Sequence, residues 1–217
     1  MADAADPAPL VRRRRGPRPG DGALREGILA AARGQFADRG YDAPTMRQIA
    51  QAAGVDTKLV YYYFGSKEGL FGATIAEPFR AARLPDLLAA APPGPDDSGS
   101  PGQRYLLAVL TALETSDFGA VFIGLIRGLG THEPSRRIFL HFIKTEVIDQ
   151  IAPRLPEPLP PARAALVGSH LLGLVTARYL LQVEPLASLP IDQLAATVGP
   201  TIDHYLFGDI PLAAAPD

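Results

Sequence analysis

The sequence predicts an all-α protein. Along most of the chain apolar residues recur three or four positions apart, the spacing of one helix face, and no stretch keeps the period of two that a strand requires. The 217 residues, 47% of them hydrophobic, suffice for the buried core of one domain or of two small ones. The predicted architecture is an N-terminal three-helix domain followed by a larger helical domain.

Composition and charge exclude several classes of protein. The chain contains no cysteine, so disulfides, thiolate nucleophiles and thiolate metal sites are excluded. No apolar run approaches 18 residues and the N-terminus lacks the apolar segment of a signal peptide, so we expect a cytoplasmic protein without a membrane partner. The net charge is −2, yet residues 12–67 carry +6 and residues 68–217 carry −6. Positive charge that attracts phosphate groups is therefore concentrated at one end.

Residues Thr45–Lys67 carry the signals of two short helices joined by a tight turn. Thr45 and Gln48 have the spacing of a capping box, which begins a helix. Gly54 supplies the left-handed conformation that ends this helix, and Asp56 is a suitable N-cap for the next one. Together these signals predict a helix-turn-helix.

The second of these helices has two distinct faces. Val60 and Phe64, four residues apart, are expected to face the core, whereas Lys58 and Tyr62 lie on the opposite side. A short helix with cationic and aromatic side chains facing outward is better explained by insertion into a DNA groove than as a folding unit. The alternative is a small helical hairpin whose tyrosines cover the surface.

This stretch resembles the DNA-binding domain of the TetR/AcrR family of bacterial transcription regulators. The residues that carry the resemblance are Phe36, Gly40-Tyr41, Thr45, Ile49-Ala50, Ala53-Gly54-Val55, Tyr61-Tyr62-Tyr63-Phe64, Lys67-Glu68 and Leu70. The family often has serine at the position of Asp56 and a small residue at that of Lys58. We accordingly divide the chain into a helix-turn-helix domain at residues 21–67, a helical effector-binding and dimerisation domain at 68–210 and a tail at 211–217.

Two groups of residues are expected to contact DNA. Lys58, whose ammonium suits guanine O6 and N7, and Arg47 near the groove edge are expected to read bases, and Leu59 to touch a thymine methyl group. The resemblance implies a second group that mainly contacts phosphates, namely Thr45, Tyr61, Tyr62, Tyr63 and Lys67. Thr57 fits either group.

Residues 1–20 are rich in Pro, Ala and Arg without periodicity, so we expect a disordered basic arm. We consider contacts between its arginines and the minor groove beside the reading helix; these residues are Arg12, Arg13, Arg14, Arg15 and Arg18. The alternative is a solvated basic tail that does not contact DNA.

The rest of the chain is expected to be helical. A helix from Ser66 to about Arg83 joins the two domains, a mobile loop follows at 85–102, and helices follow at about 103–115, 118–130, 134–152, 161–183 and 191–206. Helix 161–183 is apolar on two sides and must be buried on both. We predict that it forms, with helix 191–206, a four-helix homodimer interface of Val167, Leu171, Leu174, Val175, Leu194, Val198 and Ile202, and the resemblance implies the same. The alternative is packing within one subunit.

Aromatic residues from several of these helices indicate a ligand pocket. Its expected lining is Phe79, Tyr105, Phe118, Phe122, Phe139, Phe142 and Tyr179, with His141, His170 and Arg178 as polar anchors. A small apolar effector in this pocket would shift helix 66–83. This shift would change the distance between the two helix-turn-helix domains of the dimer, which we call its reading heads. The alternative is an ordinary aromatic core.

The sequence therefore predicts a homodimeric transcriptional regulator, a repressor that binds a palindromic double-stranded DNA operator and is relieved by a small molecule. No cofactor and no metal are expected, because the four histidines lie far apart and His141 with Glu146 has a poor spacing for a metal site. Two alternatives stay open. A closed interior would favour a second domain that recognises a protein, and polar groups converging on a deep cleft would favour an enzyme.

Overall fold

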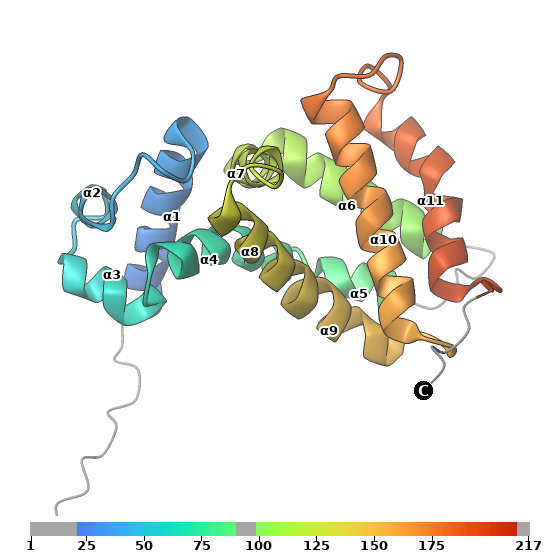
Figure 1. Ribbon diagram of the computed structural model, residues 1–217, viewed down its shortest axis with the longest axis horizontal. Helices are drawn as coiled ribbons and strands as arrows, with labels where there is room; N and C mark the ends of the chain where they lie inside the picture. Colours follow the sequence, from blue (N-terminus) through green and yellow to red (C-terminus); the bar gives the residue numbers. More distant parts are fainter. Residues whose placement is uncertain (1–20, 90–98, 212–217) are drawn as a thin grey trace, which may run out of the picture.

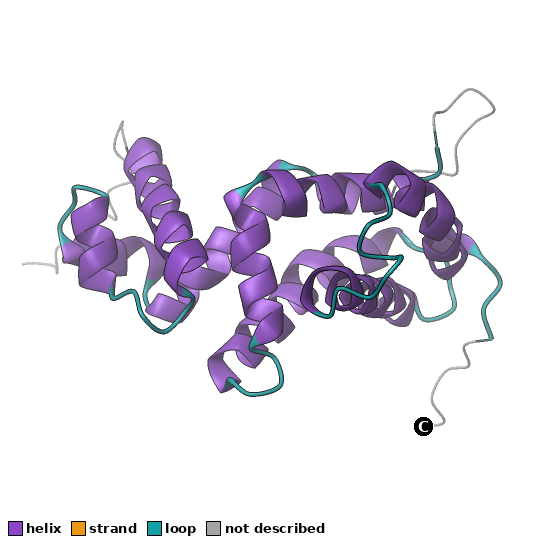
Figure 2. Ribbon diagram, turned by 90° about the horizontal axis from the view of Figure 1, so that it is seen from above, coloured by secondary structure: helices purple, strands orange, loops and turns teal. Residues whose placement is uncertain are grey.

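The computed structural model describes residues 21–89 and 99–211, and every regular element within these ranges is a helix (Figure 1; Figure 2). The N-terminal part contains α1 (Asp21–Arg39), α2 (Met46–Ala52), α3 (Thr57–Phe64) and α4 (Lys67–Ala81). In Figure 1, α1 to α3 form a small lobe, and α4 runs from this lobe into a larger one. The all-α prediction is confirmed.

The larger lobe contains α5 (Leu84–Ala89), α6 (Pro101–Thr115), α7 (Asp117–Arg127), α8 (Glu133–Phe142), α10 (Pro160–Val175) and α11 (Ile191–Phe207). Helix α8 continues through a π-helical segment, η1 (Ile143–Ile148), into α9 (Asp149–Ile151) and the 3-10 turn η2 (Ala152–Arg154). Helix α10 continues into a second π-helical segment, η3 (Thr176–Leu180). The prediction of a loop from residue 85 is wrong at its start, because α5 occupies residues 84–89.

The helix-turn-helix forms where its local signals place it. The Thr45 hydroxyl accepts a hydrogen bond from the Gln48 amide at 3.2 Å, and the Gln48 side chain accepts one from the Thr45 amide at 2.9 Å. Gly54 has φ +67°, a conformation that glycine adopts without a steric penalty. The Asp56 carboxylate accepts the Lys58 amide at 2.7 Å. The capping box, the turn glycine and the second cap are therefore confirmed.

Helix α4 belongs to the cores of both lobes. Near its start, Phe71 packs edge-to-face on Phe36 of α1, with ring centroids 4.8 Å apart. Near its end, Phe79 packs edge-to-face on Phe142 of α8, with centroids 5.2 Å apart. All four rings are buried. Because one helix contributes to both cores, the direction of α4 determines how the small lobe is oriented on the large one.

Helices α6 and α11 approach each other closely at two glycines. Helix α11 packs more extensively on α6 than on any other described element. A Cβ atom added to Gly199 of α11 would lie 2.7 Å from the backbone nitrogen of Gln103 in α6. The Gly102 amide, next to this contact, donates to the Asp203 carboxylate at 2.7 Å. The two backbones therefore touch, and only glycine fits between them.

In the described part of the chain, no single helix is long and apolar enough to cross a membrane. Helices α6 and α7 meet those criteria only as a pair, and the chain bends by 96° between them.

We expect Gly199→Ala to lower the free energy of unfolding by about 1–3 kcal/mol, because the methyl group overpacks the α6–α11 contact. Gly124 of α7 is the matched control, since a Cβ there meets no atom within 4 Å. Gly124→Ala should raise stability by up to about 1 kcal/mol through helix propensity. Urea denaturation measures both changes, and equal stability of the two variants would contradict the close approach.

Candidate DNA-binding surface and interior cavity

Helix α3 presents a cationic and aromatic face to solvent. Lys58 is exposed, and Tyr61 and Tyr62 are 50% and 76% exposed. Val60 on the opposite side is fully buried. One ammonium and two phenol groups therefore project from a short helix that is anchored in the core through its other face.

The residues beside this face are partly buried. Thr57, Leu59 and Tyr63 have intermediate exposure, and Leu59 and Tyr63 pack against the core. The rings of Tyr62 and Tyr63 meet edge-to-face with centroids 5.2 Å apart. Much of the Leu59 side chain therefore contacts the core, and only its outer atoms are available to contact a thymine methyl group.

Helix α2 contributes the other two residues expected at the DNA. Thr45 is exposed at the N-cap, where its hydroxyl also lies 3.0 Å from the Gln48 side-chain oxygen. Arg47 is exposed in the first turn of α2. Thr45 therefore holds the start of α2 in place, and Arg47 is the cation that this helix presents to solvent.

Lys67 has a structural role that its sequence position does not reveal. Its Nζ donates to the backbone carbonyl of Asp42 at 2.8 Å and lies 4.8 Å from the ring centroid of Tyr41. Partial burial lowers the pKa of this ammonium, although the Asp42 carboxylate opposes the shift. Lys67 therefore ties the start of α4 to the turn between α1 and α2. The five arginines considered for contact with the minor groove, Arg12, Arg13, Arg14, Arg15 and Arg18, lie outside the described residues.

A small apolar cavity lies among α4, α6, α7, α8 and α10. Six of the aromatic residues predicted for a ligand pocket line it: Phe79, Tyr105, Phe118, Phe122, Phe139 and Phe142. Its volume is about 30 Å³, which is about the space of one water molecule. The aromatic residues therefore converge as predicted, but they also nearly fill the space between them.

None of the predicted polar anchors reaches this cavity. Arg178 of η3 donates to the carbonyls of Leu186 and Leu189 at 2.6 and 2.9 Å and pairs with Glu114 of α6 at 3.0 Å. The Tyr179 hydroxyl donates to the same carboxylate at 2.9 Å. Burial and that carboxylate raise the pKa of Tyr179 to about 12, so the phenol stays a donor. Both side chains fasten η3 to α6, and the prediction that they face the cavity is wrong.

The two histidines also lie elsewhere. His170 packs on the ring of Tyr205 in α11, with ring centroids 5.9 Å apart. His141 is exposed at a separate surface cleft between α4 and α8. The sequence shows that a histidine lies on a helix, but it does not show which neighbouring helix that face meets.

Two family models match the chain. The model described as "Bacterial regulatory proteins, tetR family" matches residues 28–74, which include the whole of α2 and α3. The model described as "Tetracyclin repressor-like, C-terminal domain" matches residues 100–206. The chain belongs to the TetR family of transcriptional regulators.

Individual members of the TetR family resemble it over much of its length. The transcriptional regulator BetI of Burkholderia thailandensis is 29% identical over 163 residues, 73% of this chain and 80% of that protein. The transcriptional repressor BdcR of Escherichia coli is 27% identical over 141 residues, 61% of this chain and 68% of that protein. A solved TetR-family regulator from Streptomyces coelicolor superposes with a TM-score of 0.64 at 29% identity, covering 88% of this chain and 99% of that one.

Membership of the TetR family decides between two of the functions considered from the sequence. Both matching models describe regulator domains, and the similar curated proteins are transcriptional regulators. The chain is therefore a DNA-binding transcriptional regulator and not an enzyme. The Glu146 carboxylate, which the sequence offered with His141 as a possible metal site, forms an ion pair with the guanidinium of Arg80.

The dimer interface predicted from the apolar stripes of α10 and α11 is wrong for most of its residues. Val167, Val175 and Ile202 have no exposed surface within one TetR-family subunit, and Leu174 and Leu194 are also buried. Leu171 and Val198 are half-buried, and Leu171 lines the interior cavity. These side chains pack within their own subunit, so a dimer formed through these two helices would use other faces of them.

We expect Lys67→Ala to lower the free energy of unfolding by about 0.5–1.5 kcal/mol, because it removes the hydrogen bond to the Asp42 carbonyl. Lys58→Ala is the control, since Lys58 is exposed on the outer face of α3 and should change stability by less than about 0.5 kcal/mol. Thermal melts of the protein without DNA test both. Equal stability of wild type and Lys67→Ala would contradict a stabilising role for the contact between Lys67 and Asp42.

Proposed function

We propose that this TetR-family regulator is a cytoplasmic homodimeric repressor that binds a palindromic operator and is released by a small apolar effector. The observation that carries the proposal is the exposed face of α3, where Lys58, Tyr61 and Tyr62 project from a helix capped by Asp56. A helix-turn-helix that presents such a face fits the major groove, with Lys58 and Arg47 reading bases and the tyrosines positioned at phosphates. Residues 21–67 would form the DNA-binding domain and 68–210 the controlling domain.

The proposed dimer uses the outer faces of α10 and α11. On α10 these faces carry Ala165, Leu166, Ser169 and Gly173, and on α11 they carry Ala196, Thr197, Pro200 and Thr201, all exposed or half-exposed. The two helices pack against each other, so their outer faces adjoin. Small residues allow two copies of such a surface to approach closely in an isologous four-helix contact. Two reading helices would then lie about 34–36 Å apart, one turn of the duplex.

The proposed effector acts by enlarging the interior cavity. Phe79 of α4 lines this cavity and packs on Phe142 of α8, so a guest molecule there would push on the helix that carries the reading head. A ligand shifts the regulator only if it binds the two orientations of α4 with different affinities. The small cavity volume of about 30 Å³ favours a second candidate function, in which the helical domain recognises a protein partner.

Selection of bound DNA from a random pool tests the operator proposal, which requires a palindrome. On the recovered operator, Lys58→Ala should relax the preference at one base pair in each half-site, at a cost of about 1–3 kcal/mol. Lys67→Ala should weaken specific and random DNA alike, through the loss of a phosphate contact or of the tie to Asp42. Binding titrations across salt concentrations measure both. A uniform loss for Lys58→Ala would contradict base reading.

Gly168→Ala tests the effector proposal. Gly168 lines the cavity, and an added methyl group would lie 3.9 Å from Ile143 Cδ1, an ordinary contact in a cavity about as large as one methyl group. The variant should keep its operator affinity but lose at least about tenfold in affinity for any apolar compound that stabilises the wild type, or about 1.4 kcal/mol. Gly124→Ala should retain that affinity. An apolar compound that raises the melting temperature without weakening operator binding contradicts the mechanism.

A further inference from the structure

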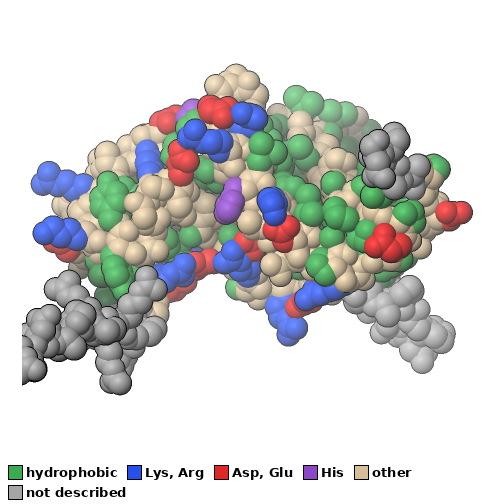
Figure 3. Space-filling view, turned by 60° about the horizontal axis from the view of Figure 1, so that its bottom comes forward, with side chains coloured by type: hydrophobic (Ala, Val, Ile, Leu, Met, Phe, Trp, Pro, Cys, Tyr) green, Lys and Arg blue, Asp and Glu red, His purple; other side chains and the backbone are tan. Residues whose placement is uncertain are grey.

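A surface cleft of about 490 Å³ separates α4 from α8 and η1. Its floor is apolar, formed by Gly72, Ala73 and Ala76 of α4 and by Ile138 and Phe142 of α8. In Figure 3, basic and acidic side chains lie side by side across the middle of the molecule on the face that comes forward. The cleft lies within the range of about 300–1,000 Å³ that small-molecule sites occupy, whereas the interior cavity does not.

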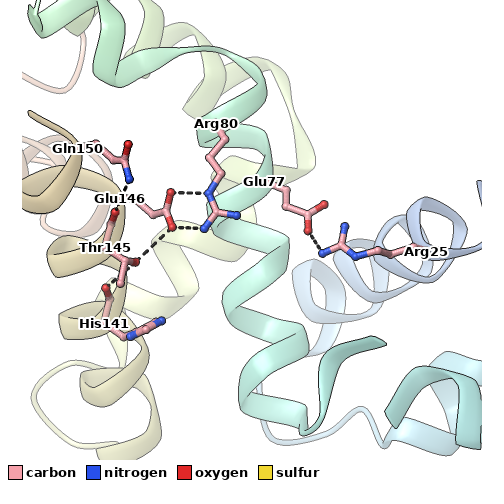
Figure 4. Close-up of polar contacts among 7 residues, drawn as sticks. All are labelled: Arg25, Glu77, Arg80, His141, Thr145, Glu146 and Gln150. Carbon is pink, nitrogen blue, oxygen red and sulfur yellow. Dashed lines mark hydrogen bonds and ion pairs between the residues drawn. The ribbon is translucent and has the colours of Figure 1, made fainter. Parts of the chain in front are cut away.

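Three ion pairs surround this cleft, and each of them joins α4 to a different element. They are Arg80 of α4 with Glu146 of η1, Arg25 of α1 with Glu77 of α4, and Arg137 of α8 with Glu68 of α4. Figure 4 shows the first two, with Glu77 and Arg80 on the same helix but directed toward different partners. The cleft therefore adjoins the contacts that hold α4 to the helical domain and to the first helix of the reading head.

The ion pair between Arg80 and Glu146 is bidentate. Arg80 Nε donates to Glu146 Oε2 at 2.6 Å, and Arg80 Nη2 donates to Glu146 Oε1 (Figure 4). The Thr145 hydroxyl donates to the His141 carbonyl at 2.9 Å and lies 3.2 Å from the same Oε1. A planar group with two parallel N–H donors is therefore the partner that this carboxylate already accepts.

The two partners of this pair differ greatly in burial. The Glu146 side chain is 3% exposed, whereas the Arg80 side chain is 61% exposed. A buried carboxylate without a cation is strongly destabilising, whereas an arginine that is mostly in water loses little by moving fully into it. The carboxylate is the fixed group of the cleft and the guanidinium is its replaceable partner. An entering cation can take the place of Arg80, but an entering anion would leave Glu146 unpaired.

We propose that the cleft between α4 and α8 is a binding site for a small organic cation, whose N–H donors replace those of Arg80 at Glu146 while its apolar body covers the floor of the cleft. Arg80 directly follows Phe79 and lies one turn from Glu77, so its release loosens α4 at the point where that helix also meets α1. The regulatory consequence rests on the proposed function, whereas the binding itself does not.

Benzamidine is a suitable probe, because it combines an amidinium group with a flat apolar ring. Benzamide and benzoate serve as neutral and anionic controls of nearly the same shape. Calorimetry with the full chain should show benzamidine binding at least about tenfold more tightly than either control. Equal binding of benzamide and benzamidine overturns the proposal.

Two amide substitutions locate the site. Arg80→Gln removes the competing guanidinium and should tighten benzamidine binding about fivefold or more, with a larger rise in melting temperature on binding. Glu146→Gln removes the fixed charge and should weaken binding about tenfold or more. Arg136→Gln is the matched control, since Arg136 pairs with Glu133 on α8 and both are 54% exposed. Arg80→Gln leaves the buried Glu146 carboxylate without its cation, so this variant is the one at risk of not folding. If it does not fold, Glu146→Gln still decides, because unchanged benzamidine binding to that variant contradicts the site.

Operator titrations with and without saturating benzamidine separate this site from the proposed function. Binding together with weaker operator affinity supports both. Binding without any change in operator affinity supports the site and contradicts its regulatory role. Absence of binding, combined with operator release by an apolar compound, overturns the site and leaves the proposed function standing.

Discussion

The orientation of the small lobe depends chiefly on α4, because this helix contributes side chains to the cores of both lobes. Its first half shares a core with α1 through Phe71 and Phe36, and its second half shares another with α8 through Phe79 and Phe142. Aromatic rings in a close-packed core do not shift without a new arrangement of their neighbours. Because α4 is packed into a core near each end, a repacking in one core would change the direction of this helix relative to the other core.

Polar contacts around α4 differ in how much they restrain it. The pair between Arg137 and Glu68 joins side chains that are 55% and 41% exposed, so water screens it strongly. The pair between Arg80 and Glu146 includes a carboxylate that is almost fully shielded from water. Loss of this pair would leave a buried charge unpaired in η1 and destabilise that segment. The contact of His132 with Asp42, at 3.2 Å, adds a further link between the two lobes. Of the two ion pairs compared above, the one with the buried Glu146 carboxylate restrains α4 more.

Features set by neighbouring residues were predictable from the sequence, whereas features set by distant ones were not. Caps and turns, such as Thr45 with Gln48, need only residues within one helical turn, and both the helix-turn-helix and the all-α fold follow from them and from the apolar spacing. The same spacing places Leu24 on the core face of α1, yet Leu24 is 45% exposed, because spacing does not show where a partner helix ends. It also does not show whether Val167 meets its own subunit or another, nor that Arg178 binds two carbonyls of the following loop.

The π-helical segment η1 puts two compartments of the protein on either side of a thin wall. Glu146 lines the outer cleft and Val147, the next residue, lines the interior cavity, while Phe142 lines both. A molecule that moves this wall from one side changes the shape of the space on the other. Thermodynamic linkage makes such an effect reciprocal, so a charged guest outside and an apolar guest inside would each alter the affinity for the other. In such an arrangement the six residues of η1 would couple the occupancy of the cleft to the occupancy of the cavity.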